Sequence, residues 1–271
     1  ANFQVGSRPN QTISFSIPEV SAANLGNFFA TTNNTKEESI GGARLSVLPS
    51  DAPHNLVQEQ AITLRGFNTG RVAPQVTVAQ EESARSIAVK INDVEGLTGV
   101  SASAKTTLTL SDFYDEGVAG TQNISFRLYG TNAKEPGSTA NAAFVAASIT
   151  EVSEAGFRKL VSAINSEKST TGITASYLDN GRVGISNSDG SDISIEAFSN
   201  ASEADALTQN TALVTGAEDT AQVTLKEGTN EDSVTVGGLV TLISPKPFSI
   251  SSSITALEGS LFNNATENEP Q

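Results

Sequence analysis

The side chains of this chain that could carry out chemistry lie in three predicted loops. The first loop holds His54, the single histidine of the chain. The other two hold closely spaced carboxylates: Asp112, Asp115, Glu116, Asp189 and Asp192. Paired carboxylates can act as acid and base in glycoside hydrolysis, and groups of them can bind Ca²⁺. An active site or a metal site is therefore the first hypothesis to weigh.

Neither a zinc site nor a catalytic triad is expected at His54. Zinc needs several nitrogen or sulfur ligands, and the chain has no second histidine and no cysteine. A Ser-His-Asp triad is formally possible, but the sequence shows no nucleophile-elbow pattern around a serine. We therefore expect His54 to lie in a surface loop.

The carboxylates fit turns better than they fit a reaction. Glycosidases hold sugar rings on aromatic side chains, and the chain offers three Tyr and no Trp. Neither carboxylate loop shows the twelve-residue calcium pattern that ends in Glu. Asp189-Gly190 is a hairpin-turn signal. We predict no catalytic residue, no cofactor and no metal site, and leave open whether one of these loops binds calcium.

Two further patterns suggest binding sites but are expected to be structural. Gly41-Gly42 and Gly237-Gly238 lack the Lys-Ser/Thr that follows a phosphate-binding loop, so turns or bulges are predicted. Asn-x-Ser/Thr triplets begin at Asn10, Asn33, Asn123, Asn200 and Asn264. Such triplets arise by chance in a sequence rich in these residues, so no N-linked glycan is expected.

The composition argues against several classes of partner. The 271 residues include 30 acidic and 16 basic side chains, which gives a formal net charge of −14. Because clustered Lys and Arg are missing, no binding to nucleic acid or to an anionic membrane is expected. The absence of cysteine excludes disulfides, thiol catalysis and iron–sulfur clusters. No apolar run reaches the roughly 18 residues that a membrane helix needs.

The elements that would position any site come from a segment that occurs twice, at residues 83–104 and 155–176. Each copy has the pattern of an amphipathic helix ending in Ile-Asn, a polar turn, then Thr-Gly and an alternating β-branched run. Helices are predicted over 82–94 and 153–166. Their buried faces are expected to hold Ala84, Ile87, Ala88 and Ile91 in one copy and Phe157, Leu160, Val161 and Ile164 in the other. Such a helix needs a sheet to pack on, so a duplicated packing module is predicted.

Alternating segments predict strands through the rest of the chain. A hairpin with one buried face is expected from residues 3–5 and 12–17. Further strands are predicted near 56–67, 71–79, 98–111, 123–129, 143–149, 172–177, 182–187, 192–198, 221–227 and 232–243. A short helix is expected at 201–208, and the tail 248–271 is expected to be weakly ordered. The predicted fold class is α+β, mainly β, with two small sheet-plus-helix modules nested in tandem.

These segments, in this order, resemble bacterial flagellin. The resemblance rests on the opening Phe3-Gln4-Val5-Gly6, on the two Ile-Asn-plus-Thr-Gly segments, and on the return Gly238–Pro245. The repeated segments look like the flagellin insertion motif. The resemblance implies that the chain is the variable outer part of a flagellin, with a β-hairpin from the inner domain at its base. It also implies that the polymerising terminal helices lie outside this chain.

The resemblance further implies a domain division and a function. Residues 1–34 with 245–271 would adjoin the inner domain, 35–118 with 213–244 would form the first outer domain, and 119–212 the second. The chain would be a non-enzymatic, extracellular part of the flagellar filament that carries its antigenic surface and O-linked sugars. Its partners would be other flagellin subunits, bound through the absent helices, so the chain by itself is expected to be monomeric. The alternatives are a cell-surface adhesin or polysaccharide-binding module, a hook-associated axial protein and, remotely, an enzyme.

Overall fold

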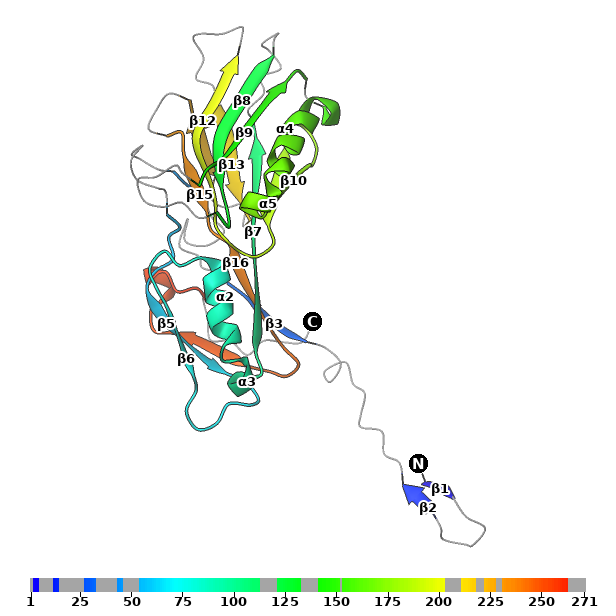
Figure 1. The fold of residues 1–271 in the computed structure, drawn as a ribbon. Helices are drawn as coiled ribbons and strands as arrows, with labels where there is room; N and C mark the ends of the chain where they lie inside the picture. The colour runs from blue at the N-terminus through cyan, green and yellow to red at the C-terminus, as the bar shows by residue number, and fades with distance from the viewer. Residues whose placement is uncertain are drawn as a thin grey trace.

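The structure is a computed structural model, and it describes most of the chain. The described residues are 2–4, 12–14, 27–32, 43–45, 54–112, 121–132, 141–151, 153–202, 211–217, 222–227 and 231–262. Over these residues the fold is mainly β with few helices, which confirms the predicted class. Figure 1 shows two lobes, each with strands and one principal helix.

We call the lobe around helix α2 the α2 module. Its elements are β3 (Phe28–Thr31), β5 (Gln60–Arg65), β6 (Gln75–Val78), α2 (Ala84–Asn92), α3 (Glu95–Thr98), β7 (Ser101–Ser111), β16 (Leu239–Ser244), β17 (Ser249–Ser252) and the 3-10 helix η1 (Ala256–Glu258). The strands β17, β5 and β6 form one antiparallel sheet, and β3, β16 and the first part of β7 form another. Helix α2 packs against β6, β7 and β16, so it contacts both sheets.

We call the other lobe the α4 module. Its elements are β4 (Ala43–Leu45), β8 (Gln122–Tyr129), β9 (Ala143–Ile149), α4 (Glu154–Ser166), α5 (Lys168–Thr171), β10 (Ile173–Tyr177), β11 (Val183–Asn187), β12 (Ile193–Ser202), β13 (Thr211–Gly216), β14 (Gln222–Lys226) and β15 (Val234–Val236). One sheet has the order β4-β15-β12-β8-β9, and the other continues from β10 through β11, β7 and β13 to β14. Helix α4 contacts β9 and β10, which are the edge strands of the two sheets, and so closes one side of the sandwich.

The two modules repeat one chain order. Each begins with a hairpin, β5-β6 or β8-β9, and continues through a helix, a one-turn helix and a strand, β7 or β10. In the α2 module β7 pairs with β16, and the next strand, β17, pairs with β5, the first strand of the hairpin. In the α4 module β10 pairs with β11, and the next strand, β12, pairs with β8, the first strand of the hairpin. A short turn joins β10 to β11, whereas all of the α4 module except β4 lies between β7 and β16. The second copy is therefore inserted into the hairpin turn of the first.

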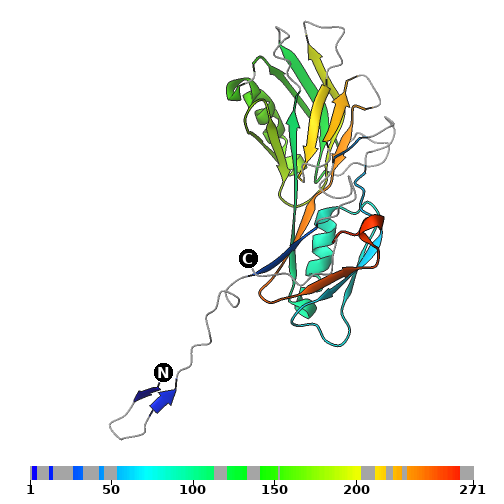
Figure 2. The same ribbon diagram turned by 180° about the vertical axis from the view of Figure 1, so that it is seen from behind.

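Strand β7 belongs to both modules. Residues 101–105 pair with β16 in the α2 module, residues 106–110 pair with β11, and residues 108–111 pair with β13. Figures 1 and 2 show it running without interruption from one lobe into the other. One continuous hydrogen-bonded strand thus holds the modules together, which is a stiffer connection than a flexible linker.

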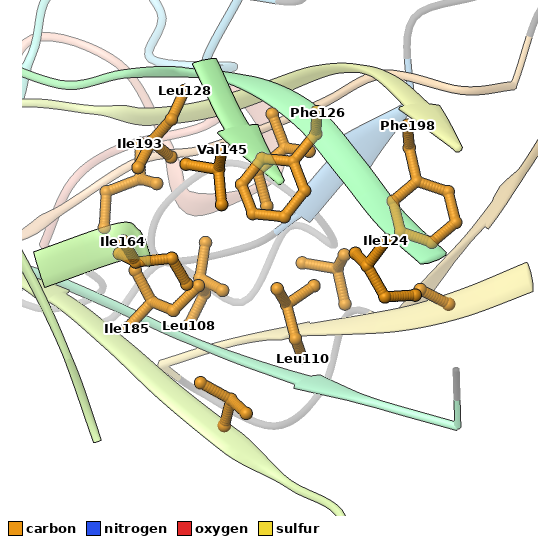
Figure 3. Close-up of a cluster of buried hydrophobic side chains, with 14 of the residues drawn as sticks. Leu108, Leu110, Ile124, Phe126, Leu128, Val145, Ile164, Ile185, Ile193 and Phe198 are labelled. Carbon is orange, nitrogen blue, oxygen red and sulfur yellow. The ribbon is translucent and has the colours of Figure 1, made fainter. Parts of the chain in front are cut away.

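The α4 module has the larger core. Side chains from β7, β8, β11 and β12 meet between the two sheets, and Figure 3 shows Leu108 and Leu110 facing Phe126 and Phe198. Helix α4 adds Phe157, Leu160 and Ile164, all fully buried, while Val161 is only partly buried. The predicted face of the helix is therefore confirmed.

The α2 module has a separate core that includes the predicted tail. The expected helix face, Ala84, Ile87, Ala88 and Ile91, is buried. The same core takes in Phe248, Ile250, Leu261 and Phe262. The expectation that 248–271 is weakly ordered is wrong over 248–262, because these four apolar side chains are buried in the core. Residues 263–271 lie outside the described part.

Three other expectations are corrected. The strand predicted over 232–243 is two strands, β15 and β16, which belong to different modules and are separated by Gly237-Gly238. The helix predicted at 201–208 is wrong at its start, because Ala201 and Ser202 extend β12 and pair with β8. Strands β3, β4 and β13 were not predicted. The predicted hairpin is present as β1 (Asn2–Gln4) paired with β2 (Thr12–Ser14); its expected buried face lies outside the described side chains.

The cores suggest a revised division of the chain. The sequence-based division assigned 213–244 to the first outer domain. In the structure Val214, Val223 and Val236 lie in the core of the α4 module, whereas Val240 and Leu242 lie in that of the α2 module. We therefore propose that the chain leaves the α2 module within β7 and returns to it at Gly237-Gly238.

Candidate functional site

The Ile-Asn pair at the end of each long helix forms a clamp on a strand. In the α4 module Ile164 is fully buried, and Asn165 reaches strand β10. Its Nδ2 donates to the Ala175 carbonyl oxygen at 2.9 Å, and its Oδ1 accepts from the Ala175 N–H at 2.8 Å. Because β10 is an edge strand, its outer backbone groups are free to pair with a strand of another molecule. The Asn165 side chain satisfies the N–H and carbonyl of Ala175 instead.

The α2 module contains the same clamp. Ile91 is fully buried, Asn92 Nδ2 donates to the Ala102 carbonyl at 2.9 Å, and Ala102 N–H donates to Asn92 Oδ1 at 2.7 Å. The partner lies ten residues after the Asn in both copies. The recurring Ile-Asn in the sequence is therefore explained by one anchor in the core and one hydrogen-bonded pair at a strand edge.

The Thr-Gly pairs turn the chain from the one-turn helix into the strand. Thr98 and Thr171 are fully buried, and each hydroxyl accepts from the N–H two residues later at 3.1 Å. The following Gly99 and Gly172 both have φ of +71°, in the left-handed region that favours glycine. These shared contacts make the two copies the same structural unit.

A polar junction joins the modules beside the start of α2. The turn after β11 lies against this helix: Arg85 N–H donates to the Gly190 carbonyl at 3.0 Å, and the Arg85 guanidinium lies 3.6 Å from Asp189. Ser83, the N-cap, accepts from Ser86 N–H. The turn therefore accepts a hydrogen bond from one of the backbone N–H groups that a helix start leaves without an intrahelical partner.

Asp192 lies at the centre of this junction. Its Oδ2 accepts from Asn55 Nδ2 of the α2 module at 2.6 Å, and Asn55 also donates to the Glu81 carbonyl at 3.1 Å. Its Oδ1 is buried and has no hydrogen-bond partner among the described residues. Burial raises the pKa of Asp192 to about 7, and the hydrogen bond from Asn55 opposes that rise.

A cavity of about 640 Å³ opens between the modules at this point. Charged, amide and hydroxyl side chains of both modules line it, with Val89 and Tyr129 among them. Burial, followed by the nearby Glu196 carboxylate, raises the pKa of Tyr129 to about 12. We call this cavity the junction pocket.

The structure brings His54 and one predicted carboxylate loop to the same pocket. His54 Nδ1 lies 3.4 Å from Glu81 Oε2 with about half of its side chain exposed, so it lies at the surface as predicted. Asp189 Oδ1 accepts from Ser191 N–H at 2.8 Å, and Gly190 has φ of +80°, so a turn is present. The predicted hairpin is wrong, because β11 and β12, which this turn joins, lie in different sheets. Asp192 is the residue that sequence reasoning undervalued, because nothing in Asn-Ser-Asp-Gly-Ser-Asp distinguishes a buried carboxylate from an exposed one.

The other predicted positions do not join this site. Asp112 is exposed at the end of β7, and Asp115 and Glu116 lie outside the described residues. Gly237-Gly238 connects β15 to β16, and Gly41-Gly42 is not described. Asn123 is exposed, whereas Asn200 is buried; Asn10, Asn33 and Asn264 are not described.

Within the described ranges no three His, Cys, Asp or Glu side chains gather to hold a metal ion. None of the helices described here is both long and apolar enough to cross a membrane.

Comparison with protein families matches residues 125–189 to the flagellin hook IN motif. The match runs from β8 through α4 and α5 to the turn after β11, so it covers the clamp of Asn165 and the Thr171-Gly172 turn. These residues form a flagellin-type insertion domain. The flagellin family is structural rather than enzymatic. No curated protein matches the chain.

Proposed function

We propose that this chain is the surface-exposed outer part of a flagellin subunit, in which two nested insertion modules form the outer face of the flagellar filament. The observation that carries the proposal is the repeated clamp: Asn92 and Asn165 make the same pair of backbone hydrogen bonds, and the second lies in the matched flagellin motif. A packing unit that occurs twice, with no metal-binding cluster among the described residues, is consistent with a structural role.

The nested architecture supports a mechanical role. Strand β7 pairs with strands of both modules, so a load on the α4 module passes to the α2 module through backbone hydrogen bonds. The Arg85–Gly190 hydrogen bond and the turn against α2 add a second point of attachment. Two attachments resist bending better than one, and a projecting domain under fluid drag needs this resistance.

The charge supports exposure at a crowded surface. A formal net charge of −14 makes neighbouring copies repel one another, which opposes sticking between filaments. In this proposal the chain sets the antigenic surface of an extracellular filament. It carries O-linked sugars on exposed Ser or Thr and contacts other subunits through terminal helices outside this chain.

Immunogold electron microscopy tests the proposal. Antibody raised against the purified chain should label the source bacterium along the whole length of each filament. A strain in which the gene is deleted provides the control and should show no label. Label confined to the cell body would contradict the proposal and favour a surface adhesin or polysaccharide-binding module.

A hook-associated axial protein is the second candidate, because the matched motif is described as a flagellin hook motif. The same experiment separates the two. Gold along the filament supports the filament subunit, whereas gold only at the junction of hook and filament, or only at the filament tip, supports the hook-associated protein.

A further inference from the structure

We propose that one buried water molecule bridges the two modules, held between Asp192 of the α4 module and Thr32 and Asn55 of the α2 module. Its site is a second cavity, of about 10 Å³, which we call the small cavity. The inference concerns how the modules are held together, and it does not depend on the place of the chain in a filament.

Both modules build the small cavity, and its walls are buried. Asp192 lines it from the α4 module, and Gly237-Gly238 lines it where the chain passes back to the α2 module. The α2 module contributes side chains that are almost fully buried, among them Thr32, Ile87 and Leu261. A water molecule in this cavity is therefore separated from bulk solvent and contacts both modules.

The unpartnered oxygen of Asp192 can meet a water molecule only in the small cavity. Asp192 borders both this cavity and the junction pocket. Its Oδ1 is shielded from solvent, whereas an oxygen on the wall of the open junction pocket would be accessible. A cavity that just holds one water gives each atom of its wall very little accessible surface, so contact with Oδ1 there agrees with this shielding.

Three polar groups around the small cavity match the hydrogen bonds of one water. Asp192 Oδ1 is an acceptor with no partner among the described residues. Asn55 Oδ1 accepts from Val57 N–H at 3.1 Å and has a second lone pair. Thr32 Oγ1 accepts from Val240 N–H at 3.0 Å, and within the described part of the chain its O–H is left to donate.

A water that donates to Asp192 and Asn55 and accepts from Thr32 makes three hydrogen bonds, the number typical of buried water. It also satisfies the carboxylate oxygen, and buried acceptors in folded proteins are nearly always satisfied. The bridge does not require Asp192 to be ionised. A carboxylate accepts from the water, and a carboxylic acid donates to it, because water is both donor and acceptor. The site should therefore hold water at pH 5 and at pH 8.

The size of the small cavity determines its occupant. A volume of about 10 Å³ is close to the least that one water needs, so a larger polar ligand has no room. Apolar cavities of this kind stay empty, but this one has polar groups on its wall. A metal ion is less well supported, because the described residues bring no three His, Cys, Asp or Glu side chains together.

A high-resolution crystal structure of the whole chain tests the position. We expect one ordered water within hydrogen-bond distance, about 2.7–3.2 Å, of both Asp192 Oδ1 and Thr32 Oγ1. Absence of electron density at this point would overturn the proposal. An anomalous peak there in crystals soaked with RbCl would also overturn it, because the occupant would then be a cation.

Oxygen-17 magnetic relaxation dispersion tests the bridge in solution, because it counts waters that stay bound longer than the protein tumbles. Thr32→Val keeps the shape of the side chain but removes the hydroxyl, so the count should fall by about one relative to wild type. Thr32→Ser keeps the hydroxyl and should keep the water. The matched control is Thr31→Val, because the neighbouring Thr31 is exposed and its hydroxyl pairs with that of Thr241.

Heteronuclear NMR spectra check that each variant is folded. An equal count in wild type and a folded Thr32→Val would overturn the proposal, and so would an equal fall in Thr31→Val. If Thr32→Val does not fold, the crystal structure of the wild type decides. Failure here leaves the filament proposal standing, because immunogold labelling does not depend on a buried water.

Discussion

At the scale of single residues, Asp192 is a carboxylate whose buried surroundings disfavour its charged form. A surface aspartate in a turn would cost nothing, but this one is covered by the α2 module and receives one hydrogen bond, from Asn55. Burial of the carboxylate in the native state raises its pKa to about 7, above its ordinary value of 3.8. The native protein therefore binds a proton more tightly than the unfolded chain does.

Asp192 should make stability fall as pH rises from about 4 to about 7. Its contribution is fully present below the unfolded pKa of 3.8 and is lost as pH rises through the folded pKa of about 7. Asp192→Asn should remove this decline and stabilise the chain at pH 8 relative to wild type, by an amount on the order of a few kcal/mol at most. Urea unfolding at several pH values measures the difference between the two proteins. A difference that does not change between pH 4 and pH 8 would show that the carboxyl is not buried as described.

At the scale of elements, the helix–strand clamp is the unit that the sequence repeats. In each copy an asparagine in the last turn of a helix pairs with the backbone of an alanine ten residues later. The clamp orders the chain between helix and strand. It also covers a strand edge that would otherwise be free to pair with another molecule.

Asn165→Ala should lower the free energy of unfolding by about 1–3 kcal/mol, because two hydrogen bonds to partly buried backbone groups are lost. Asn92→Ala should have a smaller effect in the same direction, because the two hydrogen bonds of Asn92 are exposed. Chemical denaturation of the purified variants measures both. The matched control is Asn123→Ala, which should change stability by less than about 0.5 kcal/mol, because this side chain is exposed and accepts a hydrogen bond from the exposed Ser148 hydroxyl. Equal effects at Asn123 and Asn165 would mean that the clamp carries no special stability.

Gly172→Ala tests the turn that follows the clamp. Gly172 has φ of +71°, which is costly for a residue with a Cβ atom, so a loss of about 1 kcal/mol or more is expected. Gly96→Ala is the control, because that glycine lies inside helix α3 and a Cβ there would meet no atom within 4 Å. Thermal unfolding followed by circular dichroism should show a lower Tm for Gly172→Ala alone.

At the scale of the whole molecule, nesting predicts that the outer copy folds without the inserted one. Lys105 and Leu239 are directly opposed in the β7–β16 pair, so Asn-Gly can join them as a hairpin turn in place of residues 106–238. The shortened chain should keep the core around Ile62, Ile87 and Leu242 and give a dispersed NMR spectrum. It should be less stable than the full chain, because the turn that caps α2 is gone. A spectrum of an unfolded chain would show that the α4 module is needed to complete this core.

The chain by itself should remain a soluble monomer. Its net charge is −14, and in our proposal the surfaces that polymerise lie outside it. Size-exclusion chromatography with light scattering at physiological salt should give the 28.0 kDa of one chain. Fibres or a concentration-dependent increase in mass would contradict this expectation.

The sequence by itself determined the local elements. Periodicity identified both helices, their buried faces and most strands, because amphipathic patterns reflect burial on one side of an element. Asp-Gly and Asn-Gly identified the turns, because few other residues adopt the backbone angles that these turns require. The repeat itself was visible because both copies meet the same requirements: a buried isoleucine, a clamping asparagine and a left-handed glycine.

Only the tertiary structure decided how distant segments meet. The tail residues Phe248, Ile250, Leu261 and Phe262 complete a core whose other members lie far away in the sequence, so no local pattern could reveal their burial. The extension of β7 through both modules depends on which strands pair with each part of it. The junction pocket exists because insertion of one copy into the hairpin turn of the other brings Asp192 against Asn55, 137 residues earlier in the chain. The environment of a carboxylate depends on what packs around it, and that is fixed by the fold rather than by its neighbours in the sequence.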